Sequence, residues 1–86
     1  MMPRDDRSHL LKRFPYLEKA INDKFDSSEE FRTLCRDYVD AVAALTHWED
    51  QARPTAKAKE RIIEYRHLVE NLEAEILLEL YRSTSS

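Results

Sequence analysis

Apolar residues recur every three or four positions along most of the chain, which is the period of an amphipathic α-helix. In the first half the recurring positions are Phe31, Leu34, Cys35, Tyr38, Val42, Leu45 and Trp48. After Pro54 the same spacing returns at Ile62, Tyr65, Val69, Leu72 and Ile76, and it continues to Tyr81. The pattern therefore predicts two long helices, over about residues 27–52 and 55–82.

Local signals mark where these two helices start. Ser27 and Glu30 have the spacing of a capping box, in which the serine hydroxyl accepts a hydrogen bond from a free backbone N–H of the first turn. Thr55 can cap the second long helix in a similar way. A proline disfavours the helical conformation in the residue before it, so the break between the helices falls at Arg53 and Pro54.

The two long segments are expected to pair as an antiparallel helical hairpin about Pro54. Along the first segment, successive residues of the apolar seam are alternately four and three positions apart. Along the second segment they are alternately three and four positions apart, so the two seams mirror each other. A mirror centred on the proline places Tyr38 opposite Val69 and Cys35 opposite Leu72. The short turn that this requires is typical of helical hairpins.

The first 26 residues show a weaker helical pattern, which Pro15 interrupts. Proline is well tolerated at the first position of a helix, so we expect a short helix from about Pro15 to Lys24, preceded by no more than a loose turn. This helix should pack across the hairpin, which gives three helices per chain. Residues 1–14 and the polar tail 83–86 are expected to be flexible.

The composition favours a single small helical domain, residues 1–86. The chain contains no glycine and one cysteine, and 42% of its residues are hydrophobic and 36% charged. Without glycine, the phosphate-binding loops and tight hairpin turns that need positive φ are unfavourable, so we expect an all-α fold. The sequence has no run of about 18 apolar residues and no apolar leader, so we expect a cytoplasmic protein that does not bind membranes.

The charges and reactive side chains do not form a recognisable chemical site. The net charge is −3, and no segment carries the basic stripe that nucleic-acid binding requires. Cys35 lies on the apolar seam, where a free thiol packs as a small hydrophobe. Glu64 and His67 have the spacing of di-iron ligands, but that chemistry needs a second such pair. We therefore expect no cofactor, no metal and no catalytic residue, with a metal- or small-ligand-binding helical bundle as the alternative function.

Several apolar residues remain outside the hairpin seam. At 100° per residue, Leu34, Ala41 and Trp48 form a second stripe on the first long helix, and Ile63, Leu77 and Tyr81 form one on the second. A two-helix hairpin cannot bury both stripes. Either the amino-terminal segment covers part of them in a monomeric three-helix bundle, or a second protein chain covers at least one.

The second of these possibilities gives our prediction of function. We expect a non-enzymatic protein–protein interaction module, a small adaptor or regulator of coiled-coil or helical-bundle character. It should form a homodimer or bind another helical protein through an apolar helix face. The expected interaction residues are Leu34, Trp48, Ile63, Leu77 and Tyr81.

Overall fold

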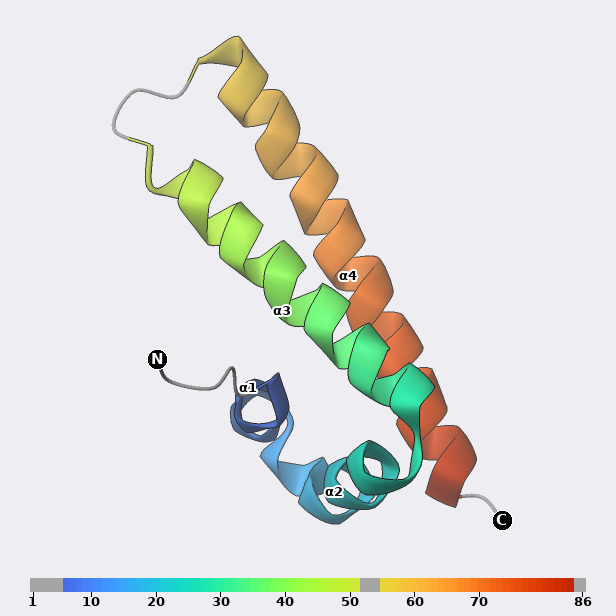
Figure 1. Ribbon diagram of the computed structural model, residues 1–86. Coiled ribbons are helices and arrows are strands. Elements are labelled where there is room, and N and C mark those ends of the chain that lie inside the picture. Colours follow the sequence, from blue (N-terminus) through green and yellow to red (C-terminus); the bar gives the residue numbers. More distant parts are fainter. Residues whose placement is uncertain (1–5, 52–54, 85–86) are drawn as a thin grey trace.

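The computed structural model describes residues 6–51 and 55–84, and its regular structure is entirely helical (Figure 1). Four α-helices follow one another along the chain: α1 (Asp6–Arg13), α2 (Glu18–Ser27), α3 (Glu29–Glu49) and α4 (Ala56–Thr84). A 3-10 turn, η1 (Pro15–Leu17), joins α1 to α2. The predicted all-α class is confirmed, whereas the predicted number of three helices is wrong.

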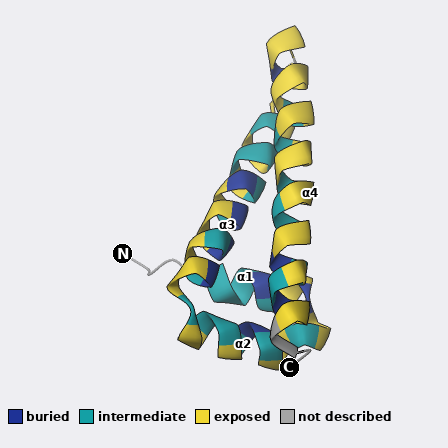
Figure 2. Cartoon of the chain, turned by 90° about the vertical axis from the view of Figure 1, so that its right-hand side faces the viewer, coloured by how far each residue is buried: buried dark blue, intermediate teal, exposed yellow. Residues whose placement is uncertain are grey.

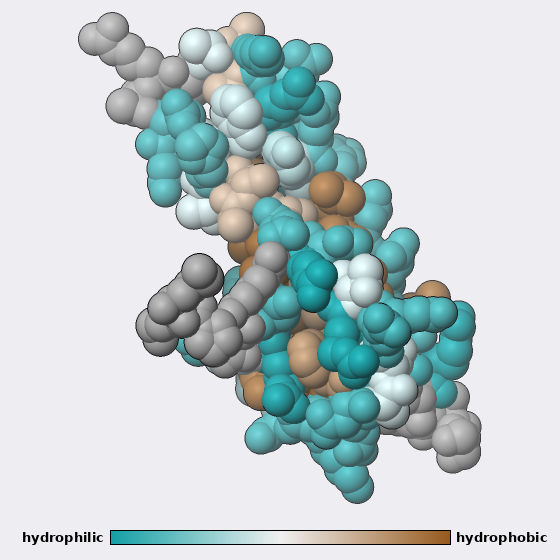
Figure 3. All heavy atoms as spheres, viewed as in Figure 1, coloured by the Kyte–Doolittle hydropathy of each residue, from teal (hydrophilic) through white to brown (hydrophobic). Residues whose placement is uncertain are grey.

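The two longest helices, α3 and α4, pack along each other and run in opposite directions (Figure 1). α3 has 21 residues and α4 has 29, so α4 reaches past the end of α3 that lies far from α2 (Figure 2). Apolar atoms reach the surface over the middle of this pair (Figure 3). None of the described helices is both long enough and apolar enough to cross a lipid bilayer.

The start of α4 agrees with the prediction, whereas its end lies further along the chain than predicted. The Thr55 cap is confirmed, because its Oγ1 accepts a hydrogen bond from the amide of Ala58 at 3.0 Å. Pro54, the expected turn, lies outside the described residues. At the other end Ser83 and Thr84, which we expected in a flexible tail, belong to α4.

The start of α3 differs from the prediction by one residue. Ser28 is the N-cap, and its Oγ accepts a hydrogen bond from the amide of Phe31 at 3.1 Å. Ser27 instead ends α2, and its hydroxyl donates to the carbonyl of Asp23 at 2.8 Å. Of two adjacent serines, the one whose backbone is extended becomes the cap, and at Ser28 φ is −132° and ψ is 114°. The predicted capping box of Ser27 and Glu30 is therefore wrong.

α1 is the helix that the sequence analysis did not predict. It ends at Arg13, and Phe14 then leaves the helical conformation, as a residue before proline should. Leu10 is 0% exposed and Phe14 3% exposed, so this segment is part of the core. A helix of eight residues is not stable alone, and its stability comes from packing that periodicity does not reveal.

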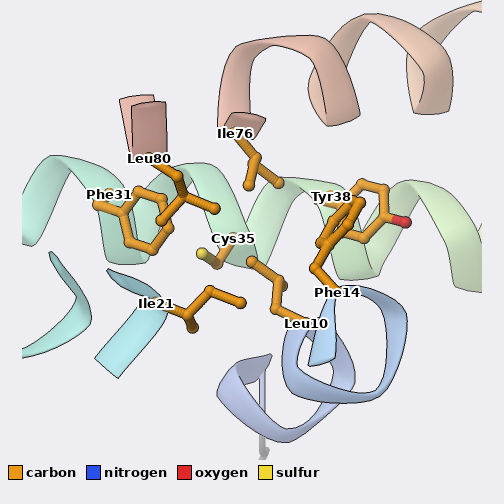
Figure 4. Close-up of a cluster of buried hydrophobic side chains, with 8 residues drawn as sticks. All are labelled: Leu10, Phe14, Ile21, Phe31, Cys35, Tyr38, Ile76 and Leu80. Atoms are coloured by element: carbon orange, nitrogen blue, oxygen red, sulfur yellow. The ribbon is translucent and has the colours of Figure 1, made fainter. Parts of the chain in front are cut away.

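The core lies at one end of the α3–α4 pair, where α1 and α2 close it (Figure 2). Eight buried side chains meet there, and each of the four α-helices supplies at least one of them (Figure 4). We call this cluster the junction: Leu10, Phe14, Ile21, Phe31, Cys35, Tyr38, Ile76 and Leu80.

The contacts at the junction involve the residues expected to pair there. The Tyr38 hydroxyl donates to Glu73 Oε2 at 2.6 Å, and Leu80 lies beside Phe31 in Figure 4. Val69 and Leu72, the expected partners of Tyr38 and Cys35, both pack against the junction. The exact register about Pro54 stays a prediction.

Replacing Ser28 with alanine should lower the free energy of unfolding by about 1 kcal/mol, because the Phe31 amide would lose its hydrogen-bond acceptor. Ser27→Ala is the matched control, since the Ser27 hydroxyl bonds only to carbonyls of its own helix, and its effect should be below about 0.5 kcal/mol. Urea denaturation followed by circular dichroism measures both. A larger loss for Ser27→Ala than for Ser28→Ala would contradict the assignment of the cap.

Candidate interaction surface

Beyond the junction, the described part of the α3–α4 pair continues as two helices, with no third helix against its far end (Figures 1 and 2). We call this part the arm, residues 39–49 of α3 and 56–72 of α4. At its near end Val39, Val42, Val69 and Leu72 pack against the junction. Only Ala41 and Ala58 are buried among its residues. Its larger apolar side chains are half-buried or exposed: Val39, Val42, Leu45, Trp48, Ile62, Ile63, Tyr65, Leu68, Val69 and Leu72. Two helices alone do not enclose an apolar seam of this length.

An open groove lies between α3 and α4 along the arm. It holds about 540 Å³ and is lined by Asp37, Asp40, Ala41, Ala44, Tyr65, Leu68 and Leu72. Leu68 is 43% exposed at the rim, and the apolar atoms over the middle of the pair are seen in Figure 3. The distance between packed helices depends on the side chains at the contact. The small side chains of Ala41 and Ala44 therefore allow a further helix to approach closely.

The groove faces away from α1 and α2. Arg32 of α3 donates through Nη1 to the carbonyl of Phe25, at the end of α2, at 2.6 Å. On α4, Glu73 binds Arg13 of α1. At 100° per residue, Arg32 lies about 140° around α3 from Asp37, and Glu73 lies about 140° around α4 from Leu68. α1 and α2 therefore pack on one side of the pair, and the groove opens on the other.

Of the five predicted interaction residues, Trp48 lies on the groove side and Leu34 lies beside α2. Trp48 is half-buried and follows Ala41 by seven residues, so the two side chains share a face of α3. Leu34, also half-buried, lines a smaller pocket with Lys24 of α2 and Glu79 of α4.

The other three predicted interaction residues lie elsewhere. Leu77 packs against the junction, while Ile63 and Tyr81 are more than half exposed on the outer face of α4. The prediction missed Leu68, although its spacing could have revealed it: Leu68 follows Tyr65 by three residues and precedes Leu72 by four.

A polar cluster at the edge of the junction joins three helices. The carboxylate of Glu73 accepts a hydrogen bond from the Tyr38 hydroxyl and two from Arg13, from Nε at 3.1 Å and from Nη2 at 3.4 Å. The ring of His9 meets the ring of Tyr38 edge-on, with 5.7 Å between centroids. Burial, followed by the bond to the Glu73 carboxylate, raises the pKa of Tyr38 to about 12. The cluster attaches α1 to the α3–α4 pair.

The remaining candidates for chemistry are separate from the groove. Cys35 is fully buried, and burial followed by the charge of Asp6 raises the pKa of its thiol to about 12, so the thiol stays protonated at neutral pH. Glu64 and His67 are exposed, and Glu64 accepts a hydrogen bond from Arg61 at 2.9 Å. Across residues 6–51 and 55–84, no three or more His, Cys, Asp and Glu side chains gather closely enough to hold a metal ion.

Comparison with known proteins adds no further assignment to this surface. No protein-family model, no curated protein and no solved structure matches the chain. The interpretation of the groove therefore depends on its geometry, its exposed surface and its charges.

The free energy of unfolding should fall as the pH rises from about 10 to about 12. Unfolded Tyr38 loses its proton near its ordinary pKa of 10.0, whereas folded Tyr38 keeps its proton until about 12. The stabilisation that Tyr38 contributes is therefore complete below pH 10 and is lost as the pH rises to about 12. Urea titrations across this range should show a smaller decline for Tyr38→Phe than for the wild type.

Tyr16→Phe is the control for this effect, because the Tyr16 side chain is 71% exposed. Its stability should decline with pH as steeply as that of the wild type. Equal declines for Tyr38→Phe and the wild type would contradict the role given to Tyr38.

Proposed function

We propose that the protein is a non-enzymatic helical interaction module, a small adaptor or regulator, that self-associates through the groove side of the arm. In this proposal α3 and α4 act as an antiparallel hairpin. Two such hairpins, one from each copy, complete a four-helix bundle. The apolar residues that are half-buried in one chain become core residues in the pair.

The observation that carries this proposal is the apolar surface that the arm leaves uncovered. Leu68 is 43% exposed at the rim of the groove, and Tyr65 and Leu72 beside it are only half-buried. On α3, Leu45 and Trp48 are half-buried as well. A second pair of helices would cover this surface, whereas α1 and α2 pack on the other side.

The character of the arm supports the same proposal. The groove is lined by Ala41, Ala44, Tyr65, Leu68 and Leu72, together with the carboxylates of Asp37 and Asp40. Stable interfaces have an apolar, aromatic centre from which charged groups are depleted, and a polar rim. Trp48 adds a second aromatic ring on the same face of α3 as Ala41.

Leu68→Glu should weaken self-association at least about tenfold, because it places a carboxylate at the centre of an apolar contact. Leu78→Glu is the matched control: it is the same substitution in the same helix, at a leucine that is 57% exposed and does not line the groove. Sedimentation velocity over a series of protein concentrations gives the dimer dissociation constant of each variant.

The wild type and Leu78→Glu should both form dimers, whereas Leu68→Glu should remain a monomer at the same concentrations. Two results would overturn the proposal. One is a wild-type chain that stays monomeric even at high micromolar concentration. The other is a Leu68→Glu variant that associates as tightly as the wild type.

A further inference from the structure

We infer that the second copy docks antiparallel to the first, with the two α4 helices crossing at Leu68 and the basic end of each facing the acidic end of the other. This inference rests on the proposed self-association and adds to it the orientation of the partner and the residues that specify that orientation.

The inference starts from one stripe of residues along α4. Its members occur at intervals of four, seven, seven and four residues: Lys57, Arg61, Leu68, Glu75 and Glu79. At 100° per residue these five positions fall within about 40° of one another around the helix. Leu68, at the centre of the stripe, lines the groove, while Glu79 at its end lies beside Lys24 of α2.

The charges of this stripe are antisymmetric about Leu68. Two basic residues precede it, and two acidic residues follow it at the same distances. When two such helices lie antiparallel with their Leu68 side chains in contact, Arg61 faces Glu75 of the second copy and Lys57 faces Glu79 of the second copy. A two-fold axis produces each contact twice. In the parallel arrangement like charges would face each other, so the stripe is self-complementary only when antiparallel.

The existing contacts of these side chains are compatible with the arrangement. Lys57, Arg61 and Glu75 are exposed. Arg61 already donates to Glu64 at 2.9 Å within α4, and a guanidinium has five N–H donors, so it can bind a second carboxylate. Glu79 is half-buried, accepts a hydrogen bond from Arg82 at 3.4 Å and lies 3.8 Å from the ammonium of Lys24. The contact of Arg61 with Glu75 is therefore the more informative one to test.

α3 is compatible with the same orientation. Ala44 lines the groove with Leu68, and its small side chain allows the second copy's α3 to approach. Asp40 precedes Ala44 by four residues and His47 follows it by three. Antiparallel α3 helices that meet at Ala44 would thus bring Asp40 near His47 of the second copy.

Charge reversal at Arg61 and Glu75 tests the orientation. Arg61→Glu alone and Glu75→Arg alone should each weaken the dimer about tenfold, because each places like charges opposite each other twice per dimer. The double variant Arg61→Glu/Glu75→Arg exchanges the two charges and should restore the dissociation constant to within about threefold of the wild type. Sedimentation velocity gives the dissociation constants, and circular dichroism melting verifies that each variant is folded.

Glu70→Arg is the matched control, because Glu70 is exposed on α4 about 160° around the helix from Leu68. It should leave the dissociation constant unchanged. One result is a wild-type dimer that neither single reversal weakens more than Glu70→Arg does. That result rejects the antiparallel arrangement and leaves the proposed function standing. A monomeric wild type rejects both. Rescue by the double variant supports the antiparallel dimer.

Discussion

The short helices α1 and α2 cannot cover the long α3–α4 pair, and this mismatch in length determines where the core forms. α1 has 8 residues and α2 has 10, against 21 in α3 and 29 in α4. At 1.5 Å per residue, α4 is about 44 Å long and α1 about 12 Å. The large buried side chains therefore gather in the junction, while the apolar residues of the arm are only half-covered. The fold and the proposed interaction surface are two consequences of one constraint.

The position of α1 is set by packing and by one carboxylate together. Leu10 and Phe14 enter the junction, and Glu73 at its edge binds both Arg13 of α1 and Tyr38 of α3. The exposed ion pair with Arg13 contributes little alone, but Tyr38 is buried and its hydroxyl needs an acceptor. The same carboxylate links α3 to α4 through the Tyr38 hydroxyl.

The three- and four-residue spacing was sufficient to predict α3 and α4, because both are long and strongly amphipathic. It also placed Cys35 on a buried seam, and Cys35 is fully buried. The spacing could not predict α1 or the choice of Ser28 over Ser27 as the cap, because both depend on contacts between helices. The spacing identified the groove-side residue Trp48 but missed Leu68, because Leu68 lies at the rim of the apolar seam and is 43% exposed.

Hydrogen exchange at a series of protein concentrations tests the central claim, that the junction folds within one chain and a second copy completes the arm. Amides of residues 41–45 and 62–69 should become more protected as the dimer forms, while those of residues 31–38 and 76–80 should keep the same protection at every concentration. Protection of the arm that equals that of the junction and does not depend on concentration would contradict the account.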